Sequence, residues 1–152
     1  MTKTFTNIHE AAFEEGRNAR GETWTALDLS GKHLGVRIED IAPGGTSSVH
    51  HYHTLEEEHV LVLDSTATLI LGAEEHSLKT GDHVWFEAGK DVAHHIENRS
   101  AANFRYLVFG ERNDGDVVYY PDNRVMMVKA PDRQLFTYRP FTLPDQPPKT
   151  ST

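Results

Sequence analysis

The chain of 152 residues contains no cysteine, which excludes disulfide bonds, iron–sulfur clusters and zinc sites built on thiolates. Any metal ion must therefore be held by nitrogen and oxygen ligands. No apolar run approaches the roughly 20 residues that a membrane helix needs. The first residues also lack the apolar segment of a secretory signal. These absences predict a cytoplasmic protein with no membrane partner.

Basic residues are scarce as well. Lysine and arginine together number 15, against 23 aspartates and glutamates, so the formal net charge is -8, and the basic residues are scattered along the chain. A nucleic-acid partner would require a basic surface that neutralises phosphates. We therefore expect no nucleic-acid partner.

Short segments rich in β-branched and aromatic residues recur along the chain and are separated by turn residues such as Gly81-Asp82. Their even spacing, with no long helical period between them, predicts an all-β sandwich or barrel. The expected strands cover residues 23–29, 34–41, 48–53, 59–63, 67–71, 76–78, 83–86, 94–97 and 104–109.

The pattern divides the chain into three parts: an N-terminal arm (1–22), a barrel (23–110) and a C-terminal extension (111–152). The arm is expected to contain one short helical turn near residues 11–15, which ends at Gly16. Six of the seven prolines fall at or after position 121. We therefore expect the extension to pack as extended chain on the barrel or on a partner subunit, with about the last ten residues flexible.

Histidine is the abundant residue, with ten in the chain, most of them between residues 50 and 95. His51 and His53 are two residues apart, so on a strand they point to the same face. Glu58 precedes an apolar strand, and on the inner face it would lie beside Val60 and Val62. A carboxylate buried there needs a cation or a hydrogen-bond partner. A metal ion bound by both histidines and Glu58 would meet that need.

A second segment supplies a third imidazole. His94 shares a strand face with the apolar Ile96, so His94 is expected to point inward and His95 outward. The same alternation places His50 on the outer face, in solvent or at an interface. Three neutral imidazoles and one carboxylate suit Fe, Mn, Co, Ni or Zn as the divalent ion and leave coordination positions for water or substrate.

These residues fall on the two sequence motifs of the cupin superfamily, which the chain resembles. The first motif, G-x5-H-x-H-x3–4-E-x6-G, is matched by Gly45, His51, His53 and Glu58. The second motif, G-x5-P-x-G-x2-H-x3-N, is matched by Gly81, Gly89, His94 and Asn98. The chain departs from the motifs at Ser65 and Glu87 and by two extra residues before His94, which alters the turns.

The resemblance implies a double-stranded β-helix (jelly-roll barrel) that holds one divalent transition metal ion. Its ligands would be His51, His53, Glu58 and His94. Glu57 is the alternative to Glu58 if the linker were one residue shorter, although the spacing to Ser65 favours Glu58. The ending at 110–122 resembles that of small, mostly uncharacterised bacterial single-domain cupins. A homodimer is expected because the sheet edges must be covered.

We expect a metal-dependent enzyme that acts on a small organic molecule, of the dioxygenase, isomerase, lyase or decarboxylase type. The alternative is a non-catalytic cupin that binds a small ligand beside a bound or structural metal, and the fold does not decide between the two. Phe86 or Tyr106 is expected to line the pocket. Arg37 and Arg105 lie in mid-strand; an inward arginine would indicate an anionic substrate, but both are expected to be exposed. No residue beyond the ligands is assigned as an acid or a base.

Overall fold

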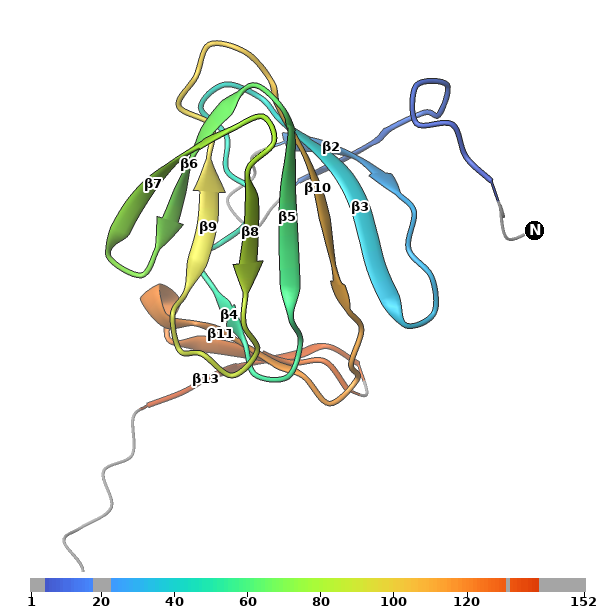
Figure 1. Cartoon of the computed structure of the whole chain (residues 1–152). Coiled ribbons are helices and arrows are strands. Elements are labelled where there is room, and N and C mark those ends of the chain that lie inside the picture. The colour runs from blue at the N-terminus through green and yellow to red at the C-terminus, as the bar shows by residue number, and fades with distance from the viewer. Residues whose placement is uncertain (1–4, 18–22, 131, 140–152) are drawn as a thin grey trace, which may run out of the picture.

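The computed structural model describes residues 5–17, 23–130 and 132–139. Apart from one short 3-10 turn, η1 (Pro121–Asn123), the regular structure of these residues consists of β-strands in three antiparallel sheets. Two of the sheets enclose the core and the third lies at one end of them (Figure 1). The expected all-β jelly-roll fold is confirmed. In the part of the chain described, no helix has the length and hydrophobicity needed to cross a membrane.

The largest sheet has six strands in the order β1-β2-β3-β10-β5-β8. In chain order they are β1 (Glu14–Arg17), β2 (Thr23–Asp28), β3 (Leu34–Ile41), β5 (Glu58–Asp64), β8 (His83–Phe86) and β10 (Phe104–Glu111). β10 lies between β3 and β5, and Tyr106 is paired with Glu39 on one side and with Val62 on the other. Alternation along these strands turns one face of each toward the barrel interior.

The second sheet has three strands in the order β7-β6-β9, namely β6 (Thr66–Leu71), β7 (Glu74–Lys79) and β9 (His94–Glu97). The apolar core lies between this sheet and the large one. It is made of the buried residues Ile41, Val60, Val62, Ala67, Leu69, Leu78, Phe86, Ile96, Phe104 and Tyr106. Removing these side chains from water provides the main driving force for closing the barrel.

The C-terminal strands form a third sheet across one end of the barrel (Figure 1). Its order is β13-β12-β11-β4, and its members are β4 (Tyr52–His53), β11 (Val117–Tyr120), β12 (Val125–Val128) and β13 (Gln134–Thr137). Val118 of β11 is paired directly with His53 of β4. The extension is therefore hydrogen-bonded to the segment that carries the paired histidines.

Two expected elements differ in the structure. The helical turn expected at 11–15 is wrong: a turn closes on the Asn7 carbonyl, and the chain then enters β1, where pairing with β2 overrides local helix preference. The strand expected at 48–53 is reduced to β4 and an isolated bridge between His51 and His94. A contact between His51 Nδ1 and the Val49 carbonyl bends the preceding residues. The expected flexible end lies outside the described residues.

Candidate metal centre

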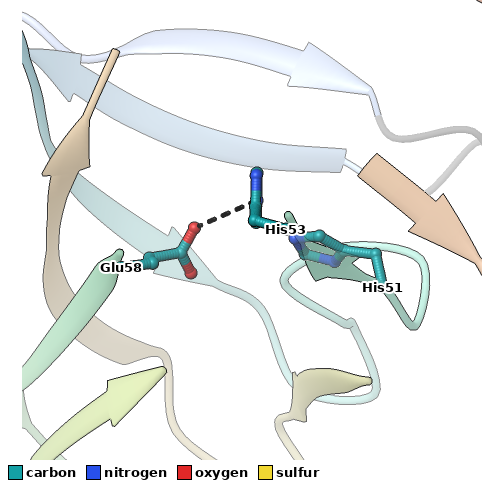
Figure 2. Close-up of side chains that lie close together, drawn as sticks. All are labelled: His51, His53 and Glu58. Atoms are coloured by element: carbon teal, nitrogen blue, oxygen red, sulfur yellow. Dashed lines mark ion pairs between the residues drawn. The ribbon is translucent and has the colours of Figure 1, made fainter. Parts of the chain in front are cut away.

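Side chains from β4 and the residue before it, from β5 and from β9 meet at one side of the barrel interior. The donor atoms of His51, His53 and Glu58 lie within 4.8 Å of one another, and Figure 2 shows the Glu58 carboxylate facing His53, with His51 beside it. His94 completes the group. Its Nε2 is 3.6 Å from Glu58 Oε1, and its ring centroid is 4.7 Å from that of His51. The structure thus brings together the four residues that the motifs indicate.

Partners that can only accept a hydrogen bond fix the tautomers of two of these histidines. His53 Nδ1 lies 2.7 Å from Asp116 Oδ2, and His51 Nδ1 lies 2.8 Å from the Val49 carbonyl oxygen. Each Nδ1 must therefore carry a proton, so in the neutral form of either ring the lone pair is on Nε2. Burial, together with the nearby imidazoles, lowers the pKa of His51 to about 4, so His51 is neutral at pH 7.

Glu58 and His94 supply the remaining donors. Burial acts to raise the pKa of Glu58, but its interactions with His94, His51 and His53 outweigh burial and lower this pKa to about 2. The His94 ring stacks on Phe86 at a centroid distance of 3.5 Å, and its buried Nε2 has no hydrogen-bond partner. Imidazole nitrogens and an ionised carboxylate directed at one another fit a divalent cation with nitrogen and oxygen ligands.

Asp116 is the residue that the sequence did not reveal. It is fully buried at 0% exposure. Its Oδ1 accepts hydrogen bonds from the backbone amides of Thr54 at 3.1 Å and Leu55 at 2.9 Å, and from the Thr54 hydroxyl at 3.2 Å. Although burial opposes ionisation, these donors and the His53 contact hold the pKa of Asp116 well below its usual range. Asp116 is 63 positions after His53, so no local spacing signals the contact.

Lys129 neutralises a second acidic group behind the histidines. His53, Glu56 and Asp116 also form a set of closely spaced donor atoms. The Lys129 ammonium, however, contacts the Glu56 carboxylate and lies 3.3 Å from Asp116 Oδ2. The lysine supplies the positive charge that this set requires. We therefore assign it a supporting role and not that of a second metal site.

A cavity of about 260 Å³ lies in front of the histidine cluster, and both Phe86 and Tyr106 line it. Glu57 also lies in its wall but is not part of the cluster of close donor atoms. Arg37 is a further lining residue, although its side chain retains 37% exposure. Arg37 is thus partly exposed, as expected, but it also lies on the face of β3 that lines the cavity. Arg105 projects from the opposite face and pairs with Asp40 at 2.6 Å.

The remaining histidines near the motifs lie outside the cluster. Strand alternation correctly places His50 and His95 away from it, but they are not solvated. His95 is 7% exposed and lies 3.0 Å from Glu97 Oε1. His50 packs edge-on against His95 at a centroid distance of 5.1 Å and contacts Asp122. Substitutions of these two histidines can therefore serve as controls for substitutions of the clustered histidines.

The chain is similar to known proteins in both sequence and structure. The family model described as "Cupin domain" matches residues 37–110, whereas curated proteins give no match. A candidate sugar phosphate isomerase from Acidithiobacillus ferrooxidans is 27% identical, with a TM-score of 0.81 over 90% of this chain and 93% of that one. This likeness extends beyond the barrel into the C-terminal extension.

Two further structures share the barrel. A predicted oxalate decarboxylase from Thermotoga maritima, 19% identical with a TM-score of 0.64, covers 72% of this chain and 100% of that one, and at this identity it shows the fold alone. A sugar phosphate isomerase from a cupin superfamily, from Silicibacter pomeroyi, is 31% identical over 68% of this chain and 69% of that one, with a TM-score of 0.66. Together with the two motifs and the barrel, these matches show that the chain belongs to the cupin superfamily.

Proposed function

We propose that this protein is a metal-dependent isomerase of a small hydroxy-carbonyl compound of the sugar class. The observation that carries the proposal is the convergence of His51, His53, Glu58 and His94 on one point of a cavity. The cavity volume of about 260 Å³ suits a small molecule. Two similar structures described as sugar phosphate isomerases, at 27% and 31% identity, support the substrate class.

The four clustered residues would hold one divalent ion, with Fe, Mn, Co, Ni and Zn all compatible with the donor set. Such an ion, when bound, polarises a carbonyl oxygen and favours ionisation of a neighbouring hydroxyl. In the isomerisation one proton leaves the carbon that bears the hydroxyl, one is added to the former carbonyl carbon, and the oxygen-bound proton changes oxygen. The substrate gains and loses no electrons, so no oxidant or reductant is required.

The residues of the chain orient these donors and supply part of the apolar surface of the cavity wall. Stacking on Phe86 prevents the His94 ring from rotating away. Asp116 holds the His53 ring through Nδ1. Val60 and Val108 contribute apolar surface to the cavity wall, which strengthens electrostatic interactions inside it. These features favour a reactive site over an ion that only ties strands together.

Hydrogen exchange in D2O tests the proposal. The full-length protein, loaded with each ion in turn, is incubated with a panel of aldoses, ketoses and their phosphates, and proton NMR follows both isomer formation and deuterium at the carbon beside the carbonyl. We expect exchange only in metal-loaded protein. His53→Ala should lose both metal and exchange, whereas His50→Ala should keep both.

Two other outcomes would replace the proposal. Tight, metal-dependent binding of a panel member with neither exchange nor turnover would indicate a cupin that binds a small ligand without catalysis. Oxygen consumption that depends on both metal and substrate, measured with an oxygen electrode, would indicate a dioxygenase.

A further inference from the structure

Three polar side chains form a connected group in the wall of the cavity that holds the histidines. Arg37 Nη2 lies 2.8 Å from Glu39 Oε1, and the Tyr106 hydroxyl donates to Glu39 Oε2. All three residues line the same cavity as His51 and Glu58. We refer to Arg37, Glu39 and Tyr106 as the polar triad.

The barrel does not need the polar triad in order to fold. The residues that share its face of the large sheet are mostly apolar, and Glu39 is only 6% exposed. Glu39 is buried while Arg37 keeps 37% exposure, so the carboxylate bears a desolvation cost that attraction to its half-exposed partner offsets only in part, and an apolar side chain would serve the fold as well. The register of β3 with β10 is already set by eight residue pairs. Because the fold does not require this buried carboxylate and its arginine, their place in the cavity wall suggests that they bind a ligand.

Arg37 is placed to bind an anion. Its guanidinium lies over the Trp24 ring at 4.7 Å, which orients its plane. One nitrogen faces Glu39, and guanidinium carries five N–H donors in all. Among the described residues, Arg37 is the one arginine or lysine in the cavity wall, whereas five lining residues are acidic: Glu39, Glu56, Glu57, Glu58 and Glu111. An anionic group that enters the cavity therefore has a single cationic side chain to meet.

We propose that the polar triad holds the far end of the substrate, with an anionic group on Arg37 and an adjacent hydroxyl on Glu39. The orientation rests on the proposed function, in which the hydroxy-carbonyl end lies at the histidines. A phosphate monoester and a carboxylate offer the same paired oxygens to a guanidinium. The proposal therefore specifies a sugar with an oxyanion at the end remote from its carbonyl.

Three probes that differ only at one carbon test the proposal: D-glucose, D-glucuronate and D-glucose 6-phosphate. Isothermal titration calorimetry is carried out on the full-length protein, both free of metal and loaded with zinc. We expect at least one of the two anions to bind about tenfold or more tightly than glucose, since a hydrogen bond to a charged group typically contributes this much. The preferred anion identifies the substrate as a sugar phosphate or a sugar acid.

Arg37→Met should bring the three affinities together. Arg105→Met is the matched control, because Arg105 has a carboxylate partner at 2.6 Å and an aromatic ring, that of Phe13, at 4.9 Å, but on the outer face. Should Arg37→Met fail to fold, Glu39→Gln provides a second test. The glutamine keeps an acceptor oxygen for the substrate hydroxyl but removes the negative charge that competes for Arg37, so it should tighten binding of the anion severalfold, which a purely structural ion pair would not do.

Equal affinities of the wild-type protein for the three probes would overturn the proposal. So would a preference for the anion that survives Arg37→Met, or one that disappears when zinc is removed, since the anion would then lie on the metal. The exchange experiment fails separately: an anion preference without isomerisation refutes the proposed reaction, and isomerisation without a preference refutes only the role of the polar triad.

Discussion

Replacing Asp116 by asparagine should invert the tautomer of His53 without changing the shape of the side chain. In the native protein Oδ1 accepts three hydrogen bonds, whereas Oδ2 accepts from His53 Nδ1 and lies near Lys129. An asparagine keeps its carbonyl oxygen toward the three donors, so its amide group faces His53. Nδ1 must then accept, and the proton moves to Nε2. The nitrogen that faces the cluster thereby loses its lone pair.

The loss of metal affinity follows from the hydrogen bond that disappears. A hydrogen bond to a charged group contributes about 1.5–3 kcal/mol, which corresponds to a factor of roughly 10 to 100 in the dissociation constant. Replacing the hydrogen-bond partner of a metal-bound histidine typically lowers the affinity for the metal by a similar factor. Competition against a fluorescent zinc chelator at pH 7 measures this change directly, and circular dichroism checks that the variant is folded.

Asp122→Asn is the matched control. Asp122 comes from the same extension and lies 3.3 Å from the Nδ1 of His50, a histidine outside the cluster. We expect this variant to change zinc affinity less than about twofold, since it leaves every clustered donor intact. A folded Asp116→Asn protein with wild-type affinity would refute the tautomer argument, and an equal loss in both variants would show that the effect is not specific to His53.

Two further predictions concern stability. Lys129→Met leaves Glu56 and Asp116 without their shared cation, so the free energy of unfolding should fall by about 3–5 kcal/mol; urea denaturation measures it, and recovery in Lys129→Arg would show that charge is the cause. For His51, whose pKa is lowered to about 4, the unfolded chain binds a proton that the folded chain does not between pH 6.5 and 4. The unfolding free energy of the metal-free protein should therefore decrease as the pH is lowered from 6.5 to 4, by on the order of 3 kcal/mol. A pH dependence that is unaltered in His51→Gln would contradict this assignment.

The fold and the grouping of the four histidine-cluster residues were accessible from sequence because both depend on local patterns. Alternation along a strand determines which side chains share a face, and an apolar neighbour marks the inner one. Because His94 shares a strand face with the apolar Ile96, its imidazole was correctly predicted to point inward. Glu58 lies two residues before the apolar Val60, which predicted a carboxylate at the barrel interior. That these residues bind a metal stays a prediction.

The parts that escaped the sequence depend on contacts between distant segments. Arg37 shares a strand face with Ile41, but the general preference of arginine for solvent gave no reason to expect it in a cavity wall; the cavity itself is formed only when β3 pairs with β10. His95 was expected in solvent or at an interface because it points away from the cluster. The outer side of β9 at this point is covered by His50, so direction and exposure differ. Asp116 belongs to a segment whose fold depends on pairing with β4.

The position of Asp116 bears on which relatives share the chemistry of the site. The cupin family model ends at residue 110, so the barrel that it describes contains the clustered donors but not the carboxylate that sets the tautomer of His53. An alignment that covers 90% of this chain, as with the Acidithiobacillus structure, must include much of the segment after residue 110. A match confined to the barrel therefore says nothing of a carboxylate at the position of Asp116. Because the partner of a ligating histidine changes metal affinity by roughly 10 to 100-fold, the C-terminal extension is better regarded as part of the site than as an appendage to the barrel.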